Sequence, residues 1–262
     1  MAAAARTPTF SDGLGVDRAG YEVAIVVPAY NEAATIREIA SCALRQARLV
    51  VVVDDGSDDD TARALEDLPV ALLRNPVNKG KGASLMRGMY YALEDGVAAV
   101  ITIDGDGQHA PDDIPRLLAM VERYPQHIIV GSRLADKAAF PRGRYYANRV
   151  ANFWISWAAG YRIEDSQSGF RLYPANLLRQ PRIANMNARG FEFESEILIE
   201  AARVGCRSIA VPIAAIYRGQ ARESHFRPVL DIVRIVRMVA WKLISRGLYL
   251  SGLYHAFFRR RS

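Results

Sequence analysis

The sequence predicts an α/β fold, a mostly parallel sheet flanked by helices, and two observations indicate it. From residue 23 to about residue 135, short apolar runs alternate with segments of helical pattern, the order that produces a parallel sheet covered by helices. Polar loops follow several of the apolar runs, at the carboxyl ends of strands, where ligands bind in such sheets. No linker or internal repeat separates the two halves of the chain.

The elements are predicted from the period of their apolar residues. Apolar runs of strand length lie at 23–27, 49–53, 71–73, 97–103, 128–130, 170–173 and 208–211. Segments of helical pattern lie at 33–46, 61–68, 83–93, 114–123, 146–159 and 192–204. Nothing before residue 135 interrupts the alternation of the two kinds.

Length and composition indicate one globular domain with a segment at either end. Half of the 262 residues are apolar and 24% are charged, which is the composition of a soluble protein. Residues 1–20 lack the apolar stretch of a signal peptide and are predicted to be a flexible tail. The domain is predicted at 21–227, and a basic amphipathic segment at 228–262. Cys42 and Cys206 lack metal-binding spacing and are predicted to be reduced, buried thiols of a cytosolic protein.

Two carboxylates and an amide alternate directly after the run 97–103. They are Asp104, Asp106 and Gln108, with glycines between them. Mg²⁺ and Mn²⁺ prefer oxygen ligands and keep room for phosphates and water, and Gly105 would let a phosphate approach closely. The pattern therefore indicates a site for a divalent cation and a diphosphate. Taken alone, the motif could also be an acidic turn before the next helix.

Four polar loops are predicted to converge on one edge of the sheet. They follow the first, second, fourth and fifth strands, at residues 28–32, 54–57, 104–109 and 131–133. Ligands bind at this edge in open α/β sheets. Each loop alone could be a helix cap, since Asn31 and Ser57 are good capping residues, but capping does not account for all four loops together.

The segment 78–82, Asn-Lys-Gly-Lys-Gly, precedes a predicted helix. It lacks the spacing of a Walker phosphate loop, and no Gly-x-Gly-x-x-Gly follows the first strand. Backbone donors at the helix N-terminus could still position a diphosphate there. A turn with solvated lysines is an equal alternative.

Together, five segments resemble family 2 glycosyltransferases, in particular the branch of dolichyl- and polyprenyl-phosphate sugar synthases. They are residues 28–32, 54–57, 78–82, 104–109 and 131–133. The resemblance extends over about residues 22–218. It implies a GT-A fold, a nucleotide-diphosphate sugar donor and an inverting transfer, with a polyprenyl phosphate as the acceptor.

The resemblance also implies roles for single residues. Asp106 and Gln108 would hold Mg²⁺ or Mn²⁺ at the donor phosphates, and Arg133 would lie near the sugar and the acceptor phosphate. Arg218 would bind the diphosphate, with His225 or Arg227 replacing a lysine that is usual in the branch. The segment 165–171 would face the acceptor, with Ser168 or Arg171 helping there. The remaining residues of the donor pocket would be Pro28, Tyr30, Glu32, Val53, Asp55, Lys81, Asp104 and Gly105.

The expected chemistry depends on negative charge at the leaving diphosphate, which a cation and arginines stabilise. Asp106, Arg133 and Arg218 are therefore predicted to be catalytic. A lipid phosphate is already anionic and needs no strong base, whereas a hydroxyl acceptor would need one. Asp165 is the best candidate for that base, with Glu192 and Glu194 behind it. The alternative is structural: Asp165 would cap a turn, and Glu192, Glu194 and Glu196 would begin a helix.

The end of the chain bears on the acceptor. Residues 247–258 form the longest uncharged apolar run, too short to span a bilayer. Earlier in the segment, Ile232, Val236, Val239, Ala240 and Leu243 gather on one helical face, with Arg234 and Arg237 opposite. We expect an interfacial helix on anionic lipid, placing the protein at the cytoplasmic face of the membrane. A helix packed on its own domain or a dimer contact is an equal alternative.

Other functions stay open at this stage. The net charge of +6 also suits nucleic acid, but no recognition module for nucleic acid is visible. Transfer to a glycolipid or saccharide hydroxyl is an alternative within enzymes. A non-catalytic nucleotide-sugar-binding subunit is the alternative of another class, and the presence of Asp104, Asp106 and Gln108 argues against it. The sequence names neither the sugar nor the oligomeric state.

Overall fold

The computed structural model describes residues 22–134, 142–186, 190, 192–213 and 228–258, and the predicted tail at 1–20 lies outside them. In this part of the chain, one seven-stranded sheet has the order β3-β2-β1-β4-β6-β5-β7. The strands are β1 (Val23–Ala29), β2 (Leu49–Asp54), β3 (Ala71–Arg74), β4 (Ala99–Thr102), β5 (Ile128–Ser132), β6 (Arg171–Pro174) and β7 (Ser208–Pro212). Only β6 runs antiparallel to its neighbours, β4 and β5. The predicted mostly parallel sheet is confirmed.

The central strands are almost entirely apolar because both of their faces are covered. Strand β1 pairs in parallel with β2 on one side and with β4 on the other. Alternate side chains point to opposite faces, so Ile25 enters one apolar core and Val26 enters the other. Ala29 is paired with Asp54 at the carboxyl ends of β1 and β2. The loops that follow these strands therefore leave the sheet at the same edge.

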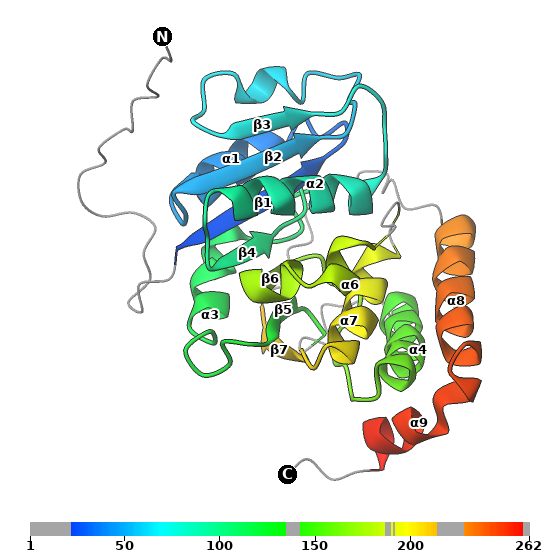
Figure 1. Ribbon diagram of the computed structural model, residues 1–262. Helices are drawn as coiled ribbons and strands as arrows, with labels where there is room; N and C mark the ends of the chain where they lie inside the picture. Colours follow the sequence, from blue (N-terminus) through cyan, green and yellow to red (C-terminus); the bar gives the residue numbers. More distant parts are fainter. Residues whose placement is uncertain (1–21, 135–141, 187–189, 191, 214–227, 259–262) are drawn as a thin grey trace.

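Helices cover both faces of the sheet (Figure 1). One core includes side chains of α1 (Ile36–Leu44) and α3 (Ile114–Leu118). The other includes side chains of α2 (Lys81–Glu94), α4 (Arg142–Ala159), α7 (Phe193–Arg203) and α8 (Pro228–Ile244). The remaining helical elements are α5 (Ala175–Leu178), α6 (Pro181–Ala184) and α9 (Leu250–Phe257), with 3₁₀ turns η1 (Arg63–Leu65), η2 (Pro111–Asp113) and η3 (Gly247–Tyr249).

The α-helix predicted at 61–68 is wrong, because that segment consists of turns around η1. The Asp59 side chain accepts the backbone N–H of Thr61 at 2.9 Å, and local bonds of this kind compete with helix formation. Pro69 limits the segment at its other end. The helix predicted at 114–123 is shorter in the structure, as α3 shows. Helices α5 and α6 were not predicted, because elements of four residues are too short to show a period.

The two cysteines are free thiols, as predicted, but Cys42 is only half-buried, which corrects the prediction that both are buried. Cys206 is buried, and burial raises its pKa to about 11. The thiol is therefore protonated at neutral pH, which makes it a poor nucleophile.

Helix α8 packs on α4 and α7 through part of the apolar face that the sequence predicts. Val239 and Leu243 are buried in the core that α4 and α7 share, whereas Val236 is exposed. This contact agrees with one of the alternatives predicted for the segment, a helix packed on its own domain. Among the described residues, no helix combines the length and the apolarity needed to cross a lipid bilayer.

Replacing Gly88 by alanine should destabilise the fold. Helix α2 lies so close to the sheet that a Cβ atom at Gly88 would be 2.5 Å from Val26 Cγ1 and 2.9 Å from Val53 Cγ2. Overpacking of this kind costs about 1–3 kcal/mol, which outweighs the gain of at most about 1 kcal/mol in helix propensity. Chemical denaturation should show the loss, and the loss should shrink in a Val26→Ala background. A Gly88→Ala protein as stable as the wild type would contradict the close packing.

Candidate active site

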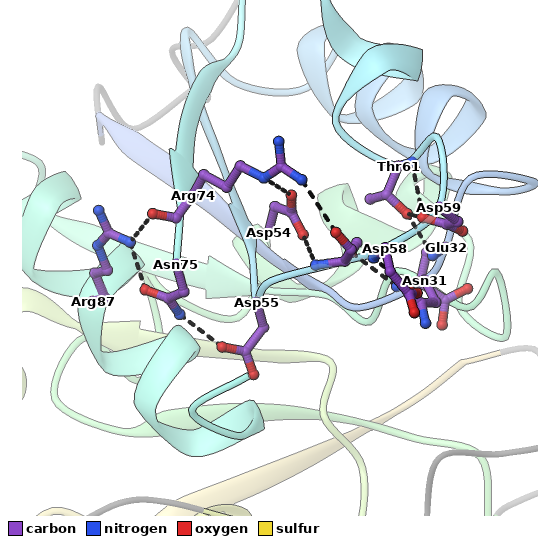
Figure 2. A network of polar contacts seen from close by, with 11 residues as sticks. Asn31, Glu32, Asp54, Asp55, Asp58, Asp59, Thr61, Arg74, Asn75 and Arg87 are labelled. Atoms are coloured by element: carbon purple, nitrogen blue, oxygen red, sulfur yellow. Dashed lines mark hydrogen bonds and ion pairs between the residues drawn. The ribbon is translucent and has the colours of Figure 1, made fainter. Parts of the chain in front are cut away.

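The loops after β1 and β2 are joined to each other by hydrogen bonds (Figure 2). The backbone N–H of Asn31 donates to Ser57 Oγ at 2.9 Å, and Asn31 Oδ1 accepts the N–H of Asp58 at 3.0 Å. The N–H of Glu32 donates to Thr61 Oγ1 at 2.7 Å. Asn31 and Ser57 therefore join the two loops to each other. Helix capping, the alternative role considered for each residue, does not include this contact.

Asp55 holds the turn before α2 in place. Its side chain is buried and accepts the backbone N–H groups of Lys79 at 2.9 Å and Gly80 at 2.8 Å. It also accepts Asn75 Nδ2 at 2.7 Å, and Arg87 Nη1 donates to Asn75 Oδ1 at 2.6 Å (Figure 2). The resemblance implied a contact of Asp55 with the donor, and the structure adds that its carboxylate shapes the loop carrying the lysine segment.

Lys81, the first residue of α2, lies between two carboxylates. Its Nζ atom is 2.6 Å from Asp104 Oδ1 and 2.6 Å from Glu194 Oε1. Burial opposes the charge, but the two carboxylates together raise the pKa of Lys81 above its ordinary value. Burial also opposes ionisation of Asp104, yet the Lys81 ammonium keeps the pKa of that carboxyl below its ordinary value. From the sequence, Glu194 was either a further candidate for the base or part of a helix start. Nothing in the local sequence predicts its ion pair with Lys81.

Three predicted residues are adjacent in the loop after β4 and at the end of β5. The N–H of Gln108 donates to Asp106 Oδ1 at 3.0 Å, and Arg133 Nη1 donates to Gln108 Oε1 at 3.0 Å. Burial, followed by the negative charge of Asp104, raises the pKa of Asp106 above its ordinary value. The structure therefore places the permanent charge of Arg133 beside the carboxylate and amide that were predicted to hold a metal.

The oxygen donors of this loop fit a divalent cation. Two carboxylates and an amide are hard ligands. The pKa of Asp106 is raised first by burial and then by the negative charge of Asp104, and a cation beside these carboxylates would favour their ionised forms. Within the described part of the chain, no three His, Cys, Asp or Glu side chains form a metal-binding group. The oxygen donors of this loop suit an ion that also takes oxygens from phosphates and water.

His109 is a buried neighbour of the site to which the sequence analysis gave no role. Its ring packs against Phe170, with the ring centroids 5.6 Å apart. Burial and the positive charge of Arg133 lower the pKa of His109 to about 3, so the imidazole is neutral at physiological pH. Its Nδ1 atom has no hydrogen-bond partner among the residues that the structure describes. The available signal was its position directly after Gln108.

The loop before β6 packs tightly against the Asp104 side chain. Asp165 is buried and accepts Ser132 Oγ at 3.1 Å and the N–H of Ser168 at 3.2 Å. A Cβ atom at Gly169 would be 2.6 Å from Asp104 Oδ2, so only glycine allows this approach. The bonds of Asp165 match the structural alternative, in which its carboxylate caps a turn.

The prediction that Arg171 helps to bind the acceptor is wrong, because this residue is buried. Its side chain is fully buried, and its guanidinium donates to the backbone carbonyls of Ser168 at 2.6 Å, Ser166 at 2.9 Å and Glu194 at 2.6 Å. A side chain engaged in this way does not reach a ligand. Arg171 instead joins the loop before β6 to the start of α7.

The other predicted donor-pocket residues lie at the ends of β1, β2 and β4. Pro28 and Val53 are direct partners across β1 and β2. The side chain of Val53 is fully buried in the core and does not face the donor, so only the backbone of Val53 remains for its predicted place in the donor pocket. Tyr30 is half-buried and Glu32 is buried, both directly after β1, and Gly105 lies next to Pro28.

Arg218, His225 and Arg227 lie outside the described residues. Their predicted contacts with the diphosphate therefore stay predictions. The arginine that the structure does place at the site is Arg133.

The chain is similar to known proteins in sequence and in fold. The model of Glycosyl transferase family 2 matches residues 24–181. The undecaprenyl-phosphate mannosyltransferase of Micrococcus luteus is 30% identical over 245 residues, 86% of this chain and 95% of that protein. The UDP-N-acetylglucosamine–dolichyl-phosphate N-acetylglucosaminyltransferase of Methanococcus voltae is 29% identical over 215 residues, 74% of this chain and 85% of that protein.

A solved structure shares the fold. It is the glucosyl-3-phosphoglycerate synthase of Mycobacterium tuberculosis in complex with Mn²⁺, UDP and glucosyl-3-phosphoglycerate. The TM-score is 0.58 at 21% sequence identity, and the match covers 87% of this chain and 81% of that chain.

Replacing Asp55 by asparagine should destabilise the fold by about 1–3 kcal/mol, the cost of leaving buried donors without an acceptor. The amide retains one acceptor oxygen for the three donors that Asp55 now serves. Urea denaturation measures the change. Asp58→Asn is the matched control, since its exposed side chain should shift stability by no more than about 0.5 kcal/mol. Equal stability of the two variants would contradict the structural role of Asp55.

Proposed function

Because the chain belongs to glycosyl transferase family 2, we propose that it transfers a sugar from a nucleotide-diphosphate donor to a polyprenyl phosphate, with inversion at the sugar. The fold is that of GT-A glycosyltransferases. Two relatives that this chain covers over most of their length carry names of polyprenyl- or dolichyl-phosphate sugar transferases, which supports the lipid phosphate as acceptor.

One observation carries the donor side of the proposal. The Lys81 ammonium, the Asp106 carboxylate and the Arg133 guanidinium gather around the loop after β4. Asp106 and Gln108 would hold Mg²⁺ or Mn²⁺, which supplies positive charge for the leaving diphosphate when bound. Arg133 keeps the Gln108 amide oriented and adds a charge that does not depend on pH. The departing diphosphate would therefore leave into a preorganised positive field.

The surroundings of Asp165 favour a phosphate over a hydroxyl acceptor. A phosphate oxygen can attack the anomeric carbon without giving up a proton, whereas a hydroxyl needs a base in reach. Asp165 was the best candidate for that base, and its carboxylate is buried and occupied by bonds from Ser132 and the neighbouring backbone. An acceptor that is already anionic needs no group in its place.

We place the enzyme at the cytoplasmic face of the membrane as a peripheral protein. The acceptor in this proposal is a membrane lipid, and the basic C-terminal segment suits an anionic surface. Oligomeric state does not enter the proposal.

Replacing Asp106 by alanine should lower transfer at least about 100-fold in Mg²⁺ or Mn²⁺, the scale at which electrostatic groups act on a leaving group. Release of nucleoside diphosphate measures it, and thermal melting should show an intact fold, because Asp106 is not part of the core. Asp112→Ala, at an exposed carboxylate in η2, is the matched control and should turn over normally. Near-normal turnover of Asp106→Ala would contradict the proposal that Asp106 holds the divalent cation.

Replacing Asp165 by asparagine separates the two acceptor classes. With a polyprenyl phosphate as acceptor, turnover should fall less than about tenfold and its pH profile should keep its shape, since no base is removed. Loss of a general base would instead cost about 10²–10⁴-fold. Polyprenol, the same lipid without its phosphate, is the matched acceptor and should not be glycosylated. Transfer to polyprenol by the wild type, lost in Asp165→Asn, would contradict the proposal.

A further inference from the structure

Exposed apolar side chains are concentrated in one region of the molecule. Seventeen large hydrophobic side chains are exposed in the part of the chain that the structure describes, and thirteen of them lie on α4 or between Val233 and Phe258. This second stretch comprises most of α8 together with η3 and α9. Figure 1 shows α4, α8 and α9 grouped along one side of the domain. We call this region the aromatic surface.

Helix α8 has apolar side chains on two sides, and packing in the domain explains only one of them. On the inner side, Val239 and Leu243 are buried, and Lys242 Nζ lies between two carboxylates of α7, 2.7 Å from Glu196 Oε1 and in contact with Glu200 Oε1. On the outer side, Trp241 is 69% exposed and Ile244 is 63% exposed. The outer side is therefore held in a fixed direction without being covered by the described residues.

Aromatic contacts join α4 and α9 into one continuous surface. Phe153 of α4 stacks on Phe257 of α9, with the ring centroids 4.9 Å apart. Trp154 stacks on Trp157 at 5.3 Å, and Trp157 Nε1 donates to the backbone carbonyl of Tyr249 at 3.1 Å. Tryptophan and tyrosine are the side chains that favour the boundary between lipid and water, because they combine an apolar body with a polar end.

The charge of the same helices is almost all of one sign. Among the described side chains of residues 145–159 and 233–258, four arginines are exposed and no side chain is acidic. The arginines are Arg149, Arg234, Arg237 and Arg246, whereas Lys242 is paired with carboxylates of α7. Arg149 and Arg237 are exposed beside the apolar side chains. A second copy of the chain seated symmetrically on this surface would bring like charges together, which costs free energy. An anionic lipid surface is complementary to both the charge and the apolar area.

We propose that the aromatic surface docks on an anionic membrane, with the outer side of α8 and the aromatic side chains of α4 and α9 entering the headgroup region. The inference deepens the proposed function, on which it rests for the location of the acceptor. It also changes the surface expected from the sequence: Val239 and Leu243 face the protein core, and residues of α4 take part.

Intrinsic fluorescence provides a direct test with the full chain. All three tryptophans lie on α4 and α8, so phosphatidylcholine vesicles containing phosphatidylglycerol should shift their emission to shorter wavelength, and bromine-labelled lipid should quench it. Pure phosphatidylcholine should give a smaller effect, and salt should weaken the binding. The absence of both the shift and vesicle flotation would overturn the proposal.

Two variants test the surface itself by flotation. Trp241→Glu with Ile244→Glu should lower vesicle binding about tenfold or more, because two large apolar groups no longer leave water. Arg237→Glu should weaken binding to anionic vesicles by a similar factor and leave binding to neutral vesicles unchanged. Tyr91→Glu with Val204→Glu, exposed residues outside the surface, and Arg45→Glu, directly after α1, are the matched controls. They should bind within about twofold of the wild type.

Thermal melting should show that these variants fold, since the replaced side chains point to solvent. Unchanged flotation of both surface variants would overturn the proposal. So would light scattering that shows a dimer dissociated by the Trp241→Glu and Ile244→Glu pair, without vesicle binding by the wild type. The assay contains neither donor nor acceptor, so its outcome is separate from that of the transfer reaction.

Discussion

A mostly buried lysine between two carboxylates sets the arrangement of the site. Lys81 begins α2, Asp104 follows β4 and Glu194 lies in the first turn of α7, so one ammonium group joins segments that are far apart in the sequence. Removing the ammonium would leave the carboxylates unpaired where water hardly reaches them, and removing both carboxylates would do the same to the ammonium. Breaking a buried ion pair in this way typically costs about 3–5 kcal/mol of folding stability. The same three elements also carry or border the loop with Asp106 and Gln108, the turn held by Asp55, and the loop joined to α7 by Arg171. Site and core are therefore stabilised by the same contacts.

Much of the fold could be predicted from the sequence, because buried parallel strands and the helices between them have distinct apolar patterns. The convergence of polar loops followed from strand direction alone, and it brought Asp106, Gln108 and Arg133 together as predicted. The ion pair of Lys81 with Glu194 could not be predicted, since it joins two helix starts whose relative position depends on the whole sheet. The turns at 61–68 were missed because the Asp59 side chain competes locally with helical hydrogen bonding.

The C-terminal helix shows why an apolar stripe in a sequence does not identify its partner. The periodicity of α8 is that of an amphipathic helix, and it is satisfied partly by the protein core through Val239 and Leu243. The exposed Trp241 and Ile244 lie on another side of the helix, outside the apolar face that carries Val239 and Leu243. Lys242 makes ion pairs with Glu196 and Glu200, and these pairs attach α8 to α7.

The burial of Arg171 bears on how the substrate could be enclosed. Its guanidinium donates hydrogen bonds to the carbonyls of Ser166, Ser168 and Glu194. Moving the loop 165–169 outward would leave this cation buried without those acceptors, which is costly in free energy. This loop cannot swing as a lid. The loop is already ordered before a ligand binds, so ligand binding bears no entropic cost for ordering it.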